Sequence, residues 1–347
     1  MKLRLKVERL VRENRVGWLG GVVIDTNDGR MVFDPAATRS MEHDAHIFIS
    51  HAHSDHTLGF QSSIMKYSTK ETKRIFEKLR GKTVRNWRPV EYGQRIRIGD
   101  TEILPLNAGH MLGSAQFKVV TSDHTYVYTG DLNCVNTLTT EAAEVPKCDT
   151  LIIEATYGDP SFIFPRRERT YARIVNWALQ EVKDGHMPTF HVYSSGKSQE
   201  IVRLFNVYTK LPVVCASIVN RANEAYNEAG IDLSFVEADT MEGKTLLRKG
   251  NCVYVTTRRT NSSVPHHASE AMATGWAVRF GSRSYASFPL SSHAGFDQLI
   301  KYVAKTDARR VYVFTGYGEL ISKHLRKELK VEADPLPLFS QRSILDY

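Results

Sequence analysis

Short apolar runs that end in polar residues recur along the first half of the chain. Two of them, residues 22–24 and 31–33, flank a turn that contains Asp28-Gly29, a pattern typical of a β-hairpin. Further strands are predicted at residues 46–49, 126–129 and 150–153. Each of these three strands is followed directly by side chains that can bind metal or transfer protons, and a rigid sheet could present them at its strand ends.

The pattern changes after about residue 162. Helices and strands alternate from there, which indicates a small α/β unit with a parallel sheet. The predicted elements are helices at 169–183, 199–206 and 220–229 and strands at 190–193, 211–215 and 252–255. In the first of these helices, Ile174, Ala178 and Leu179 are among the apolar side chains expected to face inward.

Composition and charge add information about partners. The chain has 347 residues, of which 42% are hydrophobic and 24% charged, as in ordinary soluble proteins. No membrane span or signal peptide is expected, because no apolar run is long enough. The net charge of +8 fits a polyanionic substrate, although a generally basic soluble protein would have it too. The four cysteines lack C-x-x-C spacing and are expected to be buried free thiols in a cytoplasmic protein.

Potential metal ligands are concentrated just after the strand at 46–49, in the run His51-Ala52-His53-Ser54-Asp55-His56. Imidazole and carboxylate groups suit zinc, manganese or iron. His51 and His53 point the same way if the backbone is extended, whereas Asp55 and His56 can face a second metal. A polar loop that happens to be rich in histidine is the alternative. Three histidines and one aspartate directly after a strand argue against it.

Other candidate residues follow later strands. His110 lies in a loop with two glycines, which lets it approach a ligand site closely. Asp131 follows Gly130 at the end of a predicted strand, where a carboxylate can bridge two cations. Glu154 follows the strand at 150–153. Each of these residues, taken alone, would more often be an ordinary surface or strand-end residue.

The order of these residues resembles that of a known family. The run at 51–56 is similar to the H-x-H-x-D-H motif of the metallo-β-lactamase superfamily. The Gly-His pair at 109–110 and the Thr-Gly-Asp run at 129–131 resemble its next two ligand motifs. The resemblance implies an α/β fold with four layers, αββα, into which a second α/β unit is inserted.

Two further matches resemble the β-CASP branch of this superfamily, whose members cut nucleic acids. Glu154 takes the place of its acidic residue, and Ser-Ser-His at 291–293 resembles its S-x-H pattern. The resemblance implies a metallo-β-lactamase domain formed by residues 1–164 and 286–347. The β-CASP cap domain would span residues 165–285.

The resemblance also implies roles for individual residues. The implied metal ligands are His51, His53, Asp55, His56, His110 and Asp131. Asp34 would orient them from behind, although a plain strand-end aspartate is the alternative. Glu154 would hold His293 as an imidazolium that protonates the leaving oxygen, with Asp55 as a further catalytic residue. Thr315 stands where RNA-processing members carry a metal-binding histidine. The expected cofactor is therefore zinc, one ion tight and a second weaker, or manganese.

Ser195, Gly196, Lys197 and Ser198 are predicted to bind a substrate phosphate. They precede the helix predicted at 199–206, and backbone N–H groups at the start of a helix attract phosphate. A nucleotide-binding P-loop is disfavoured, because its spacing requires glycine where this chain has His191. A plain strand-to-helix turn is the alternative.

DNA is the favoured partner. Residues 156–165 and 193–197 resemble the T-Y-x-x-P-x-Y-x-F-P and Y-S-x-G-K runs of Artemis-type DNA-repair nucleases. Bacterial DNA-ligase-associated exonucleases have a similar run and a similar length. Glu154 and Gly158, however, also occur among RNA-processing nucleases of the cleavage-and-polyadenylation-factor and RNase J type. We therefore predict a metal-dependent nuclease, with a repair-type DNA exonuclease favoured and an RNA-processing enzyme as the alternative.

Two other classes fit the sequence less well. A small-molecule hydrolase of the same superfamily, such as a lactonase or thioesterase, would not need a cap of the β-CASP kind or a basic surface. A non-catalytic scaffold would usually have lost metal ligands, and all six candidates are present. Protein partners are unknown from the sequence.

Overall fold

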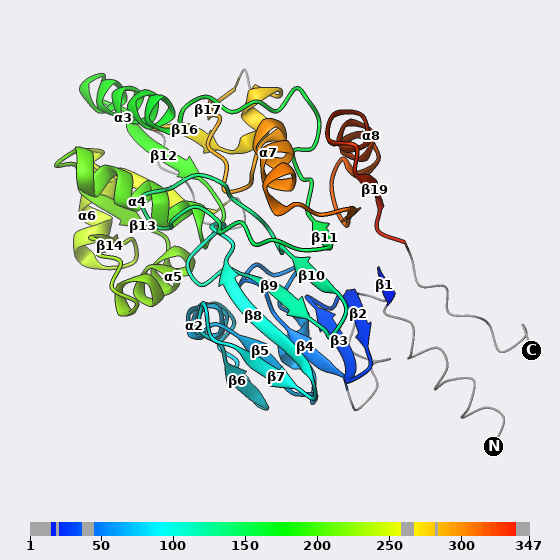
Figure 1. Ribbon diagram of the computed structural model, residues 1–347. Helices are drawn as coiled ribbons and strands as arrows, with labels where there is room; N and C mark the ends of the chain where they lie inside the picture. Colours follow the sequence, from blue (N-terminus) through cyan, green and yellow to red (C-terminus); the bar gives the residue numbers. More distant parts are fainter. Residues whose placement is uncertain (1–14, 19–20, 37–44, 258–266, 282–283, 338–347) are drawn as a thin grey trace, which may run out of the picture.

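The structure, a computed structural model, describes residues 15–18, 21–36, 45–257, 267–281 and 284–337 (Figure 1). Its first sheet has six strands in chain order. They are β1 (Arg15–Trp18), β2 (Val22–Thr26), β3 (Gly29–Phe33), β4 (His46–Phe48), β5 (Lys66–Ser68) and β6 (Trp87–Pro89). Strands β2 and β3 form the predicted antiparallel hairpin, and β3 to β6 are parallel to one another.

The second sheet has seven strands in the order β19-β18-β11-β10-β9-β8-β7. They are β7 (Ile96–Ile98), β8 (Thr101–Asn107), β9 (Ala115–Val120), β10 (Thr125–Tyr128), β11 (Thr150–Ile153), β18 (Arg310–Val313) and β19 (Glu332–Pro335). The two sheets pack face to face around aromatic side chains. The ring centres of Phe33 and Tyr128 are 5.0 Å apart, and those of Phe48 and Phe117 are 5.2 Å apart.

Helices cover the outer face of each sheet, so the layers are helix, sheet, sheet and helix. The helices are η1 (Leu58–Gln61), α2 (Lys70–Arg80), α7 (Phe296–Thr306) and α8 (Gly318–Leu329). Phe60 and Phe76 pack against β4 on one side, and Leu299 and Leu325 pack against β11 on the other. This is the predicted four-layer arrangement. Among the described residues, no helix is both long and apolar enough to cross a membrane.

The third sheet has six strands, all parallel, in the order β14-β13-β15-β12-β16-β17. They are β12 (Met187–His191), β13 (Val213–Cys215), β14 (Val236–Glu237), β15 (Val253–Thr256), β16 (Ala268–Ala273) and β17 (Ala286–Phe288). The parallel α/β unit predicted after residue 162 is therefore present. Its strands β13 and β15 are buried along their whole length, as expected when helices cover both faces of a sheet.

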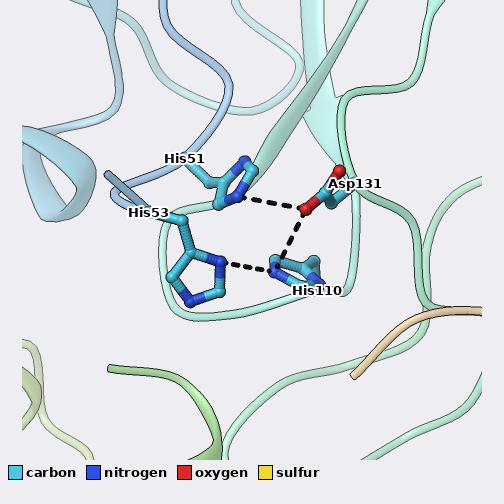
Figure 2. A group of neighbouring side chains, drawn as sticks. All are labelled: His51, His53, His110 and Asp131. Atoms are coloured by element: carbon cyan, nitrogen blue, oxygen red, sulfur yellow. Dashed lines mark hydrogen bonds and ion pairs between the residues drawn. The ribbon is translucent and has the colours of Figure 1, made fainter. Parts of the chain in front are cut away.

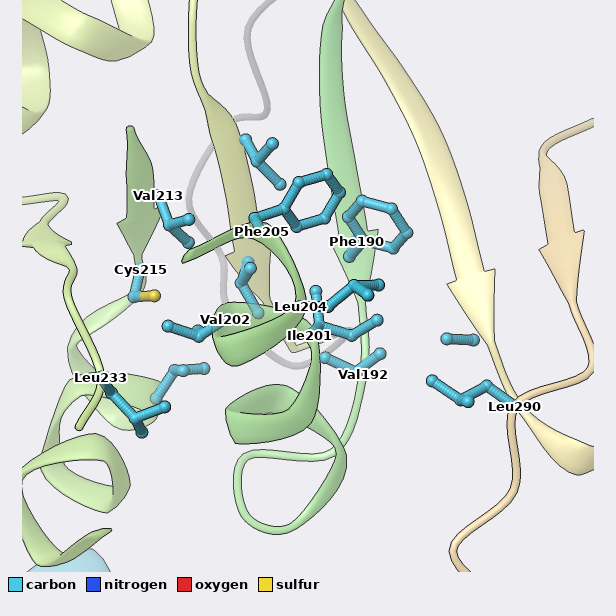
Figure 3. Close-up of a cluster of buried hydrophobic side chains, with 14 of the residues drawn as sticks. Phe190, Val192, Ile201, Val202, Leu204, Phe205, Val213, Cys215, Leu233 and Leu290 are labelled. Carbon is cyan, nitrogen blue, oxygen red and sulfur yellow. The ribbon is translucent and has the colours of Figure 1, made fainter. Parts of the chain in front are cut away.

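Helices cover both faces of this third sheet. They are α3 (Arg167–Lys183), α4 (Lys197–Tyr208), α5 (Ser217–Glu228) and α6 (Met241–Lys249), with the short η2 (Gly275–Val278) at the β17 edge. Helices α3, α4 and α5 share a core with Phe190 and Phe205 (Figure 3), whereas α6 packs on the opposite face. Ala52 and Met111, from loops of the first two sheets, belong to the core of α3 to α5. The third sheet is thus packed against these loops.

Two details of the fold differ from the sequence-based expectation. Strand β9 was not predicted, because the buried amide of Gln116 interrupts its apolar pattern. Leu179 was expected to face inward but is 44% exposed. The buried face of α3 follows Tyr171, Ile174 and Ala178 at helical spacing, and the next residue is rotated away from it.

Candidate metal centre

Five histidines and three carboxylates gather where strands of the first two sheets end. Parallel strands β10 and β11 bring Asp131 and Glu154 to the same edge. Two left-handed glycines, Gly109 (φ 72°) and Gly130 (φ 54°), let the neighbouring loops approach closely. A Cβ atom on Gly109 would lie 2.4 Å from the Asn133 carbonyl oxygen. Larger residues at these positions would push the loops apart.

Asp131 contacts four imidazoles, and Figure 2 shows its links to two of them, His51 and His110. Its Oδ2 is 3.3 Å from His51 Nε2, 3.7 Å from His110 Nε2 and 3.9 Å from His293 Nε2. Its Oδ1 is 3.6 Å from His56 Nε2. Burial opposes the charge of this carboxylate, but the surrounding imidazoles, His56 first, hold its pKa well below the usual range. Each oxygen therefore faces a different set of imidazoles, as a bridging ligand requires.

Three histidines each have one ring nitrogen bound away from the cluster. The acceptors are Ser50 Oγ for His51 Nδ1 (2.9 Å), the Ser195 carbonyl for His53 Nε2 (3.2 Å) and the Ser292 carbonyl for His110 Nδ1 (2.7 Å). The two carbonyl oxygens can only accept, so His53 Nε2 and His110 Nδ1 carry the proton. The Ser50 hydroxyl gives its own proton to Asp34 and therefore accepts from His51 Nδ1. The opposite nitrogens then present lone pairs to the cluster, where His53 Nδ1 and His110 Nε2 are 3.1 Å apart.

This set of donors fits a divalent cation. His51 Nε2 is buried and has no hydrogen-bond partner among the described residues. Burial lowers the pKa of His53 to about 3 and the pKa of His110 well below its usual value, so both rings are neutral at pH 7. Together with Asp131 they offer ligand atoms that all lie within 4.8 Å of one another. Neutral imidazoles and a carboxylate are common zinc ligands.

Asp34 lies behind the cluster, in a left-handed conformation (φ 47°). Its carboxylate accepts hydrogen bonds from Ser50 N (2.7 Å), from the Ser50 hydroxyl and from His56 Nδ1 (2.8 Å). It therefore orients His56 directly and His51 through Ser50. Burial alone would lower the pKa of His56, but Asp131 and Asp34 together raise it to about 10.

Asp55 and Thr315 lie apart from this arrangement. The Asp55 side chain is 78% exposed, and its Oδ2 is 3.7 Å from His56 Nε2. Thr315 is exposed at the end of β18, beside the end of β11. The predicted residues thus divide into a closed group and an open group. The closed group is His51, His53, His110 and Asp131, and the open group is Asp55 and His56, to which only the sequence resemblance adds Thr315.

Glu154, which is buried, and His293, which is half-buried, form a pair next to the closed group. His293 Nδ1 donates to Glu154 Oε1 at 2.8 Å, and the same oxygen accepts from Leu132 N at 2.9 Å. The second oxygen accepts from Thr156 N at 3.0 Å, so the carboxylate is fixed at both ends. Burial opposes a charge on His293, but Glu154 and Asp131 outweigh it and raise the pKa of His293. Its Nε2 faces the cluster.

The predicted phosphate loop lies against the closed group. The Ser195 carbonyl contacts His53, and a Cβ atom on Gly196 would lie 3.8 Å from His53 Nε2. Lys197 is the first residue of α4 and only 6% exposed, and burial lowers its pKa to about 8. Its ammonium group makes no hydrogen bond or ion pair with the residues that the structure describes. Ser198 differs, because its hydroxyl donates to a backbone carbonyl of the preceding turn at 2.6 Å.

Some residues that shape the site were not predicted. Arg167 binds Glu200 through two hydrogen bonds of 2.7 Å and the Ser291 carbonyl through a third of 2.9 Å. This ion pair joins α3 and α4 to the segment that carries His293. Its two members stand 33 positions apart in no known motif, so the sequence offers no signal for them.

Ser50 and Tyr128 also support Asp34. The Tyr128 hydroxyl donates to the Asp34 carboxylate at 2.8 Å. Tyr128 lies within a predicted strand, where an aromatic ring suggests core packing and nothing more. Ser50 directly precedes His51, and a hydroxyl next to the first ligand was an available signal.

Comparisons with known proteins identify the family of this chain. Residues 22–213 match the family model described as Beta-lactamase superfamily domain. A "Probable DNA ligase" of Opitutus terrae is 28% identical over 290 residues, which are 81% of this chain and 28% of that protein. An "RNase J-like protein" of Methanocaldococcus jannaschii is 33% identical over 106 residues, 30% of this chain and 25% of that protein. The chain thus spans about a quarter of the length of these relatives.

A solved structure supports the fold. The crystal structure of a protein of unknown function from Enterococcus faecalis V583 aligns over 94% of this chain and 97% of that one, with a TM-score of 0.64 and 15% identity. The predicted fold class is confirmed, and the predicted enzyme class, a metal-dependent hydrolase, agrees with the family. The chain belongs to the metallo-β-lactamase superfamily, in its β-CASP branch.

Proposed function

We propose that the protein is a metal-dependent nuclease that hydrolyses phosphodiester bonds, with DNA as the favoured substrate. The observation that carries the proposal is the position of Lys197 beside the closed group. Its side chain is only 6% exposed, its ammonium group has no hydrogen bond or ion pair among the described residues, and it lies at the start of α4. A neutral small molecule would not repay the burial of this cation, whereas a backbone phosphate would.

The closed group would hold one divalent metal. His56 and Asp55 would hold a second, and Asp131 would be a ligand of both. We propose zinc for the first position and a more weakly bound zinc or manganese for the second. Such metals, when bound, activate a water molecule and neutralise charge on the reacting phosphate. The role of the chain is to keep the imidazoles of His53 and His110 neutral and to fix the orientation of all three rings of the closed group through Ser50, Ser195 and Ser292.

His293 would donate the proton that the leaving oxygen needs. Its Nδ1–H is bound to Glu154, which leaves Nε2–H directed towards the cluster. Glu154 and Asp131 raise the pKa of His293, which favours the protonated ring. Glu154 would position the ring and stabilise its charge, and Lys197 would hold a phosphate of the substrate.

The share of this chain that each relative matches supports the choice of DNA over RNA. The relative named for a DNA ligase matches 81% of this chain, whereas the RNase J-like relative matches 30%. The RNase J-like match is shorter but has the higher identity, 33% against 28%. This favours the second candidate, an RNA-processing nuclease. In either case we propose that the third sheet and its helices form a cap over a catalytic domain built from the first two sheets. The boundary expected at 285/286 falls just before β17, which pairs with β16, so the proposed cap extends to Phe288. The cap would supply Lys197.

One digestion experiment tests the proposal. DNA and RNA strands of matched sequence, labelled at one end, are incubated with the protein and zinc or manganese, and the products are separated by length. We expect cleavage of DNA by the wild type and none by His53→Ala prepared in the same way. Faster cleavage of RNA would favour the second candidate. Absence of cleavage on both strands, together with turnover of a lactone or thioester, would overturn the nuclease proposal.

A further inference from the structure

Arg167 of α3 and Glu200 of α4 form a buried ion pair. The Arg167 side chain is 10% exposed and the Glu200 side chain 3%. Nε and Nη2 of the arginine donate to one carboxylate oxygen each, and Tyr171 donates its hydroxyl proton to the same carboxylate. A buried ion pair adds little net stability, because the desolvation of the two charges offsets their attraction. The pair is therefore better explained by what it orients than by stability.

The arginine end of the pair holds the turn that orients His110. Arg167 Nη1 donates to the Ser291 carbonyl at 2.9 Å. The Ser291 hydroxyl accepts from His293 N at 2.9 Å and donates to the His293 carbonyl at 2.8 Å. Ser292 lies between these two residues, and its carbonyl accepts from His110 Nδ1 at 2.7 Å. The orientation of the His110 ring thus depends on a turn that Arg167 binds.

The carboxylate end of the pair holds the first turn of α4, which orients His53. Glu200 lies in this turn, and its backbone N–H donates to the Gly196 carbonyl at 3.2 Å. The residue before this glycine is Ser195, whose carbonyl accepts from His53 Nε2 at 3.2 Å. Since both carboxylate oxygens of Glu200 are bound, a rotation of α4 about its axis would break the pair. One ion pair is therefore linked to two ligands of the closed group.

We infer that the Arg167–Glu200 pair is a clamp that positions His53 and His110, so that the metal affinity of the closed group depends on the third sheet and its helices. Both members of the clamp are positioning residues, which act through the Ser292 and Ser195 carbonyls. Partners that orient a ligand before the metal arrives usually contribute about 10- to 100-fold to affinity. The inference rests on the proposed metal site and identifies contacts that make it tight.

The zinc affinity of the full-length protein tests the clamp without any substrate. The metal is removed with a chelator, and the Kd of the tight zinc is measured by competition with a coloured chelator. Arg167→Met removes the charge and the bond to Ser291, so Kd should rise by about 10- to 100-fold. Arg167→Lys keeps the charge but lacks the planar fork that reaches both oxygens and the carbonyl, so Kd should rise less.

A matched control comes from a second forked pair. Arg30 donates to Asp25 through Nε at 2.7 Å and through Nη2 at 3.1 Å. It lies near the start of β3, whereas Asp34 follows the end of that strand. Arg30→Met should therefore leave the Kd for zinc unchanged. A rise in Kd equal to that of Arg167→Met would show a general effect of losing an ion pair and would overturn the clamp.

A triple variant separates positioning from stability. Arg167→Met, Tyr171→Phe and Glu200→Met together replace the pair and its hydroxyl partner by apolar side chains, a change that often preserves or raises stability. We expect a melting temperature close to that of the wild type, with zinc still bound at least tenfold more weakly. Wild-type zinc affinity in the folded triple variant would overturn the clamp. Where a variant does not fold, Glu200→Gln, which keeps the size of the side chain, is measured with the same two outcomes.

The clamp and the proposed nuclease activity can fail separately. Weaker zinc binding in the variants, together with a wild type that cleaves neither labelled strand, would retain the clamp and reject the nuclease. Cleavage by the wild type, together with variants that keep its zinc affinity, would retain the nuclease and reject the clamp.

Discussion

Asp131 belongs to the closed group and also faces His56 of the open group, but the chain holds the members of the two groups with different firmness. In the closed group, each imidazole has its outer nitrogen bound to a serine hydroxyl or to a backbone carbonyl. In the open group, only His56 is held in this way, by Asp34, while Asp55 is 78% exposed. Ligands that are oriented before the metal arrives lose less entropy on binding it. One half of the centre is thus preorganised and the other half is not.

The largest effect is expected from breaking the closed group. His110→Ala removes a neutral nitrogen that faces Asp131 and should abolish the proposed hydrolysis, lowering kcat by about a thousandfold or more. Asp55→Ala removes an exposed carboxylate of the open group and should cost less, on the order of 10- to 100-fold. Rates with the labelled strand at saturating metal, with melting temperature as a check of folding, measure both. Equal losses in the two variants would contradict the comparison.

The proton donor proposed beside the closed group gives the next largest effect. His293→Ala should lower kcat by about 10²- to 10⁴-fold on a natural phosphodiester, because the leaving oxygen would depart without a proton. A p-nitrophenyl phosphodiester has a leaving group that needs no proton, so its hydrolysis should fall far less. Glu154→Gln should resemble His293→Ala in a milder form, because it removes the charge that raises the pKa of His293. An equal loss on both substrates would show that His293 acts in some other way.

How far the sequence revealed this centre depended on whether a residue belongs to a local motif. The run at 51–56 marks four candidate ligands within six positions, and the hairpin and the parallel third sheet follow from local periodicity. The difference between the two groups arises instead from contacts between distant segments. His53 is bound by a carbonyl 142 positions away and His110 by one 182 positions away. Backbone carbonyls carry no sequence signature, so the firmness of the closed group could not be predicted.

Asp34 links the two groups and gives an intermediate effect. It binds His56 directly and His51 through Ser50, so Asp34→Ala should weaken metal retention in both, by about 10- to 100-fold in affinity. Asp34→Asn keeps a hydrogen-bonding side chain that tolerates the left-handed backbone and should lose less. Competition with a coloured chelator measures the affinities. A loss confined to one metal would show that Ser50 does not transmit the effect.

Metal counting addresses the open group directly. We expect one metal per chain after extensive dialysis and a second only when metal is added, because Asp55 and Thr315 are exposed and a hydroxyl is a poor ligand. Thr315→His should retain one additional ion. Native mass spectrometry before and after dialysis gives the counts. Two equally tight metals in the wild type would contradict the difference between the groups.

The smallest effect is expected at Lys197, the first residue of α4, which lies beside the closed group. Burial lowers the pKa of Lys197 to about 8, so its ammonium group is charged at pH 7 and mostly neutral at pH 9. If it holds a substrate phosphate, KM should rise by up to about tenfold between these pH values, since one unit above its pKa only about a tenth of an amine is protonated. Lys197→Arg keeps its charge over this range, so its KM should change less with pH.

Lys197→Ala should have a weak affinity at both pH values and a shallower salt dependence, because fewer counterions are released on binding. A KM that rises equally in wild type and Lys197→Arg would assign the pH dependence to another group and leave the start of α4 as a plain turn.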